Sequence, residues 1–140
     1  MRNTHYQHLL QHKNHYYECP PPDTTLPIIH AIRILHKDIY SISGKLAKRD
    51  KLGIHSLIET KVINILSLVI ESAFKARSQK QSFLETTRVQ IEVLKHLIRT
   101  EHELGILDMK TYIRISGQII EISKMTNGWI SYITQKEARN

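Results

Sequence analysis

Apolar residues recur at intervals of three and four along most of this chain, from Ile28 to Ile133. An α-helix turns once every 3.6 residues, so this spacing aligns the apolar side chains in one stripe on each helix. Each stripe has to be buried against another element. The pattern therefore predicts an all-α fold.

Short polar connections divide the pattern into four stripes, the second of which ends before a turn predicted at Arg77 to Lys80. Four helices with short links favour an antiparallel up-down-up-down four-helix bundle, which we place at residues 25–136. In chain order the stripes are Ile28, Ile32, Leu35, Ile39, Ile42 and Leu46; Ile54, Leu57, Ile58, Val62, Ile65, Leu66, Val69 and Ala73; Leu84, Thr87, Ile91, Leu94 and Ile98, widened by Phe83, Leu97 and Leu104; and Tyr112, Ile115, Ile119, Ile122, Thr126, Trp129 and Ile133.

Several residues mark the expected helix ends. Pro27 is expected in the first turn of the first helix, and Asp50 as the N-cap of the second. Gly105 suits the left-handed residue that closes the third helix, and Asp108 the N-cap of the fourth. Asn127-Gly128 is a turn signal, but its flanks keep helical spacing, so we expect the fourth helix to continue through it.

Residues 1–24 differ in composition and are expected to form a flexible or extended tail that ends in three prolines. Its histidines would align on one face of a helix and could bind zinc, nickel or copper. We favour solvated side chains, because no carboxylate or cysteine completes a metal shell. Cys19 is interpreted as an incidental thiol. The histidines are His5, His8, His12 and His15.

Catalytic signatures are missing from the sequence. The five glycines lie too far apart for a phosphate-binding loop, and His102-Glu103 lacks the second histidine of a zinc-protease helix. Glu92 and His96 suit an exposed pair better than a metal site. We therefore expect no enzyme activity, cofactor or metal. Val62 to Ile70, the longest apolar stretch, is too short to span a membrane, so we expect a soluble, cytoplasmic protein.

The charge indicates the kind of partner. Twenty Lys and Arg residues against thirteen Asp and Glu residues leave a net charge of +7. Such a surplus attracts polyanions, although it also fits a merely soluble surface. The basic residues form three sets from which phosphates could be contacted. They are Lys45, Lys48, Arg49 and Lys51 in the first connection; Arg88, Lys95 and Arg99 on the third helix; and Lys110 and Arg114 at the start of the fourth.

The second helix has more apolar surface than one bundle core needs. Leu68 and Ile70 lie away from its main stripe. Excess apolar area on the flank of a bundle is typical of an oligomer interface, although single surface leucines are also common.

The C-terminal helix pair resembles a known family. The run Glu103-Leu104-Gly105-Ile106-Leu107 is followed by Tyr112, by Ile119-Ile120-Glu121-Ile122-Ser123-Lys124-Met125 and by Gly128-Trp129. Upstream stand Lys51-Leu52-Gly53 and Ile58-Glu59. Their order and spacing, over about residues 26–134, resemble the accessory variability determinant proteins of diversity-generating retroelements.

The resemblance implies a basic, barrel-like homopentamer of four-helix bundles. Such a protein binds nucleic acid and the reverse transcriptase of the element, and it supports mutagenic synthesis of cDNA from a template RNA. The polymerase active site would lie in the partner.

Two alternatives stay open. One is the four-helix protein encoded in intervening sequences of ribosomal RNA, although its usual Ile-Ala-Glu-Gly-like segment is replaced here by Val69-Ile70-Glu71-Ser72-Ala73. The other is a helical protein-protein adaptor without nucleic-acid binding.

Overall fold

The computed structural model describes residues 22–138 of the chain, and their side chains from Pro27 to Gln135. All regular structure in this range is helical. The helices are α2 (Pro22–Ser43), α3 (Lys48–Leu52), α4 (Ile54–Phe74), α5 (Arg77–Glu103) and α6 (Met109–Ala138). The expected flexible tail, with its four histidines and Cys19, lies almost wholly outside the described residues.

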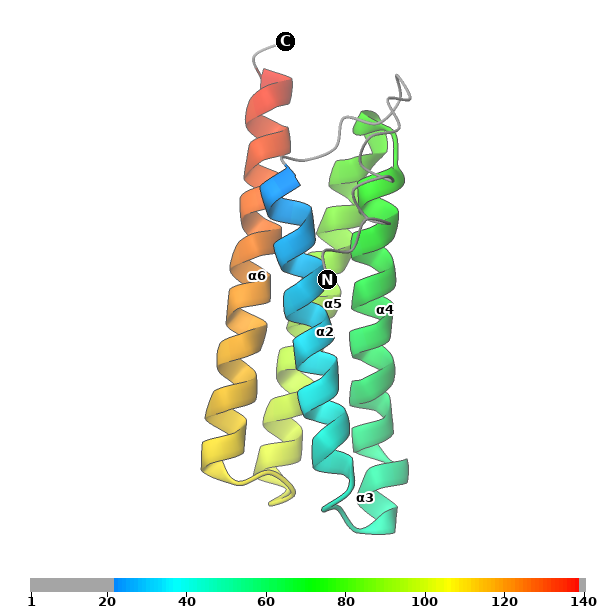
Figure 1. Cartoon of the computed structure of the whole chain (residues 1–140), viewed down its shortest axis with the longest axis vertical. Coiled ribbons are helices and arrows are strands. Elements are labelled where there is room, and N and C mark those ends of the chain that lie inside the picture. The colour runs from blue at the N-terminus through cyan, green and yellow to red at the C-terminus, as the bar shows by residue number, and fades with distance from the viewer. Residues whose placement is uncertain (1–21, 139–140) are drawn as a thin grey trace, which may run out of the picture.

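The four long helices lie side by side around one core (Figure 1). α4 contacts α5, α5 contacts α6, and α2 contacts both α4 and α6, so the helices close a ring. The connection after α2, the short helix α3 and the connection between α5 and α6 all lie at the lower end of the molecule in Figure 1. We call this the α3 end. The connection between α4 and α5 lies at the opposite end.

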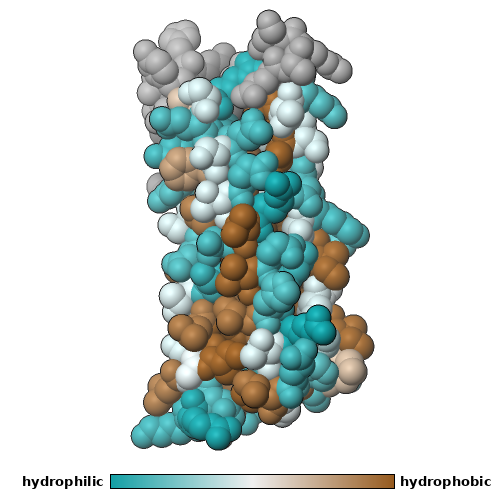
Figure 2. All heavy atoms as spheres, turned by 180° about the vertical axis from the view of Figure 1, so that it is seen from behind, coloured by the Kyte–Doolittle hydropathy of each residue, from teal (hydrophilic) through white to brown (hydrophobic). Residues whose placement is uncertain are grey.

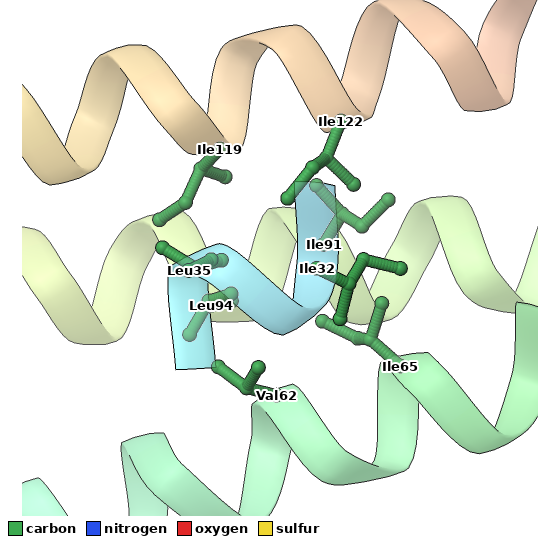
Figure 3. Close-up of a pocket in the computed structure, with 8 residues that line it drawn as sticks. All are labelled: Ile32, Leu35, Val62, Ile65, Ile91, Leu94, Ile119 and Ile122. Carbon is green, nitrogen blue, oxygen red and sulfur yellow. The ribbon is translucent and has the colours of Figure 1, made fainter. Parts of the chain in front are cut away.

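Eight aliphatic side chains form the middle of the core, two from each long helix (Figure 3). They point toward one another around a void of only about 10 Å³, and all are almost completely buried. Burial of apolar surface in this densely packed core makes the main contribution to holding the helices together. The eight residues are Ile32, Leu35, Val62, Ile65, Ile91, Leu94, Ile119 and Ile122.

Most of the predicted stripe residues are buried, including the polar Thr87 and Thr126 and the large Trp129. The prediction is wrong for Leu57 and Leu104, which are 62% and 64% exposed. Leu57 lies beside the stripe on the flank of α4, and Leu104 is the C-cap that follows the last residue of α5.

Two predicted helix boundaries are also wrong. Asp50 lies inside α3 instead of capping the second long helix, which begins after Gly53. The segment predicted as a turn at Arg77 to Lys80 is the first turn of α5. The actual break is at Lys75 and Ala76, and Lys80 is buried because its ammonium donates hydrogen bonds to the carbonyls of Ser72 and Ala73 at the end of α4.

The connection between α5 and α6 is as predicted. Gly105 has a φ of 76°, the left-handed conformation that glycine adopts without steric cost. The Asp108 carboxylate accepts a hydrogen bond from the backbone N–H of Thr111 at 2.7 Å and so caps α6. α6 then continues through Asn127-Gly128, which confirms the expectation of one helix there.

At its start the first long helix differs from the prediction. α2 begins at Pro22, so Pro27 lies in the second turn and not in the first. No helix within residues 22–138 has both the length and the apolar character needed to cross a lipid bilayer.

Candidate functional site

Basic side chains concentrate at the α3 end. Lys45, Lys48, Arg49 and Lys51 are all exposed on the connection after α2 and on α3. Arg49 pairs with Asp50 at 3.1 Å, whereas the side chains of the three lysines make no hydrogen bond or ion pair within the described structure. These lysines are therefore available to an external anion.

The start of α6 brings more charge to the same end. Hydrogen bonds from the backbone and then the side chain of Thr111 lower the pKa of Asp108, and the positive charges of Lys110 and Lys45 lower it further. Lys45 and Lys110 thus lie near one carboxylate, although 65 residues separate them in the chain. Arg114 pairs with Asp38 of α2 at 3.2 Å.

An open cleft of about 440 Å³ lies between the end of α2 and the start of α6. Lys45 and Arg114 line it, together with the carboxylates of Asp38 and Asp108. The hydroxyl-bearing Ser41 and Thr111 also line it. Because its charges are mixed, the cleft by itself favours no particular ligand.

The predicted basic set on α5 is in a different situation. Arg88 forms an ion pair with Glu85, Lys95 with Glu92 at 2.7 Å, and Arg99 with Glu103 at 2.7 Å. Each partner lies one turn away on the same helix. The positive charge of this set is therefore balanced locally, although Arg99 lies near Tyr112 at the start of α6.

Two further cations were missed in the sequence. Arg33 and Lys37 are exposed on α2, and their side chains have no partner among the described residues. They fall between the stripe residues Ile32, Leu35 and Ile39, so the same helical period that buries those three turns Arg33 and Lys37 toward solvent. That period is the signal that could have found them.

A buried polar pair holds the helices together beneath the basic surface. His55 of α4 and Glu101 of α5 both have fully buried side chains, and His55 Nδ1 lies 2.9 Å from Glu101 Oε2. His55 Nε2 lies 2.8 Å from the backbone oxygen of Ile39 in α2. A carbonyl only accepts hydrogen bonds, so Nε2 carries a proton and donates it.

Electrostatics favour the charged form of His55. Burial lowers the pKa of His55, but the hydrogen bond with Glu101, the backbone bond to Ile39 and the charges of Glu101 and Glu59 together raise it above the ordinary value of 6.5. The backbone oxygen of Glu101 also accepts a hydrogen bond from Ile106 at 3.0 Å. The pair therefore links three long helices, next to the connection that leads to Lys110.

Within residues 22–138 there is no group of three or more His, Cys, Asp or Glu side chains placed to hold a metal ion. Comparison with family models, with curated proteins and with solved structures finds no match to this chain. The arrangement of charge and apolar surface on this helical fold therefore carries the functional information.

Proposed function

We propose that the chain is a non-catalytic, nucleic-acid-binding accessory subunit of a retroelement reverse transcriptase. It would support mutagenic synthesis of cDNA from a template RNA. Its fold in this proposal is the antiparallel up-down-up-down bundle, assembled as a homo-oligomer, with a pentamer implied by the family resemblance. The bundle presents its charges to the nucleic acid, and the polymerase partner supplies the chemistry.

The observation that carries the proposal is the concentration of cations at the α3 end. Residues 38–51 and 108–114, which are distant from one another in the sequence, carry six cations and three carboxylates at this end. Such an excess in one place attracts a phosphate backbone more strongly than the same charges dispersed. The cations are Lys45, Lys48, Arg49, Lys51, Lys110 and Arg114, and the carboxylates are Asp38, Asp50 and Asp108.

A matched pair of triple variants tests nucleic-acid binding. Lys45→Gln, Lys48→Gln and Lys51→Gln together remove three unpaired charges, whereas Arg88→Gln, Lys95→Gln and Arg99→Gln remove three paired ones. Both variants have the same net charge. Affinity for an oligonucleotide is measured at several salt concentrations, because each lost phosphate contact lowers the slope of log K against log salt by about 0.7 to 0.9.

We expect the slope of the lysine variant to indicate about two to three fewer phosphate contacts than that of wild type. The slope of the α5 variant is expected to indicate less than one contact fewer. Equal loss in the two variants would mean that only net charge matters, and would contradict a site at the α3 end. A wild-type protein with no salt-dependent binding would refute the proposed function altogether.

The partnership with a reverse transcriptase has its own test. The face opposite α2 carries apolar side chains gathered toward the α3 end (Figure 2). The exposed apolar residues of α4 and α5 include Leu57, which is 62% exposed, Val89, which is 57% exposed, and Val93, which is 38% exposed. Exposed apolar surface of this kind suits a protein partner. A reverse transcriptase gene with paired template and variable repeats beside the gene for this chain would support the pairing, and co-purification of the two proteins would test it directly.

The same apolar face favours a second candidate function, a helical adaptor that binds a protein alone. Leu68 and Ile70, the residues expected on the flank, are half-buried, and Ile70 packs against the core. Val89→Ser with Val93→Ser is therefore the informative variant. An adaptor would lose its partner in this variant, would bind independently of salt, and would be unaffected by the lysine variant.

A further inference from the structure

The solvent face of α2 carries a continuous row of polar and aromatic side chains. His30, Arg33, Lys37 and Tyr40 follow one another at intervals of three, four and three, so they lie along one side of the helix. All four are exposed, and Tyr40 is 65% exposed. We call these four residues the α2 row. α2 lies at the front of Figure 1, and its lower end leads to Lys45 and the α3 end.

The acids near the α2 row are engaged elsewhere. Asp38 is the one acid among the described side chains of α2, and its Oδ2 accepts a hydrogen bond from Gln118 at 2.7 Å and pairs with Arg114. Glu59 of the neighbouring α4 lies 3.6 Å from the buried His55. The α2 row therefore keeps a positive charge that an external anion can neutralise.

Tyr40 gives this row a second property. Its exposed ring lies one turn beyond Lys37, and Lys45 follows just after the helix ends. An exposed aromatic ring between cations is the arrangement by which proteins bind unpaired bases, since the ring stacks on the base while the cations contact the phosphates. In a duplex the bases are already stacked on one another and offer no face to the ring.

We propose that the α2 row binds single-stranded nucleic acid, with Tyr40 stacking on an unpaired base and Arg33 and Lys37 contacting phosphates. Arg33 and Tyr40 are about 10 Å apart along the helix axis, at 1.5 Å per residue. Each strand of a duplex rises about 3.4 Å per nucleotide, and at that spacing the distance from Arg33 to Tyr40 corresponds to about three nucleotides. This inference rests on the proposed function, and it extends the site from the α3 end along α2.

The test compares Tyr40→Leu with Tyr40→Phe, because leucine removes the aromatic ring and phenylalanine keeps it. Binding is measured to an oligothymidylate and to a duplex of the same length at constant salt. Tyr40→Leu is expected to weaken single-strand binding about 5- to 100-fold, and Tyr40→Phe by less than about twofold. Neither change is expected to alter duplex binding. Leu57→Ala, which removes a similarly exposed apolar side chain from α4, is the matched control.

A spectroscopic measurement reports stacking directly. Tyr40→Trp places a new indole on the row, whereas the native Trp129 is buried and supplies a constant background. Oligothymidylate is expected to quench the new fluorescence, and to leave that of Val89→Trp on α5, whose native side chain is 57% exposed, unchanged. Both variants are checked by circular dichroism for an intact helical fold.

The outcomes separate the two proposals. If the lysine variant loses binding while Tyr40→Leu binds the single strand as well as wild type, the α3 end is the site and the inference on the α2 row is wrong. If Tyr40→Leu weakens duplex and single strand equally, stacking is also refuted. If wild type binds neither nucleic acid, the proposed function fails together with this inference.

Discussion

Replacing Glu101 by Gln is expected to destabilise the fold by about 2 kcal/mol near neutral pH. The variant keeps the size of the side chain and an oxygen that can accept from His55, but it removes the charge. A hydrogen bond to a charged group contributes about 1.5–3 kcal/mol, and removing one partner of a buried pair outright costs about 3–5 kcal/mol. Because Glu101→Gln retains the acceptor oxygen, its cost in stability is expected to fall in the lower of these two ranges.

The dependence of this loss on pH follows from His55. Its pKa in the folded protein is raised above 6.5, so the folded state keeps a proton that the unfolded state has released. The stabilisation is therefore fully present below pH 6.5 and is lost as the pH rises through the folded-state pKa. The difference in free energy of unfolding between wild type and Glu101→Gln is expected to be largest near pH 6.5 and to shrink toward alkaline pH.

Urea unfolding at a series of pH values measures this difference. The fluorescence of the buried Trp129 reports on tertiary structure and far-UV circular dichroism on helix content, and coincident curves support a two-state analysis. Glu92→Gln is the control, because Glu92 pairs with Lys95 on the surface, where such pairs contribute about 0–1 kcal/mol. A Glu101→Gln variant as stable as wild type, or a difference that grows with rising pH, would refute this account of the pair.

Two further predictions concern the connection between α5 and α6. Gly105→Ala is expected to lower the free energy of unfolding by about 1–2 kcal/mol, because alanine is strained at the positive φ of this position. Gly117→Ala lies within α6 with open space around it, and is expected to raise the free energy of unfolding by up to about 1 kcal/mol. Changes of the same sign for the two variants in urea unfolding would contradict this. Asp108→Ala is expected to lower the melting temperature at neutral pH, and the difference from wild type is expected to vanish as the pH falls below 3.8 and through the lowered pKa of Asp108. A difference that persists in acid would mean that Asp108 acts through something other than its charge.

The four long helices were predictable because their signal is local and repeated. Ile28 to Ile39, for example, follow the helical period without interruption, and each interval adds to the evidence. Gly105 and Asp108 were predictable for a related reason, since the conformation of a cap depends on its own residue and the next few.

The wrong predictions for Lys80 and Leu57 arose because the same local sequence pattern is compatible with either a buried or an exposed side chain. Lys80 stands in a polar segment that resembles a turn, yet it also lies four residues before the buried Leu84, in line with the stripe. Only the neighbouring carbonyls of Ser72 and Ala73 made burial of its ammonium favourable. Leu57 was predicted to be buried and is exposed, because an apolar residue beside a stripe is buried only if another helix covers it.

The candidate site likewise combines contacts along one helix, which could be predicted, with contacts between distant segments, which could not. The ion pair of Glu92 with Lys95 is a contact across one helical turn, so the balanced charge of α5 could have been found in the sequence. The α2 row could also have been found from the helical period. No local pattern indicates that Lys45 and Lys110 approach the same carboxylate, or that His55 meets Glu101 from 46 residues away.

The order of residues by itself determined which segments become helices, which side of each helix is apolar, and where the connection between α5 and α6 turns. These properties depend on neighbours within about one helical turn. The tertiary structure alone decided which cations gather at the α3 end and which polar groups are buried together. Those contacts exist only after apolar packing has brought distant segments side by side, because charge separation and burial are set by distances in space and not by distances along the chain.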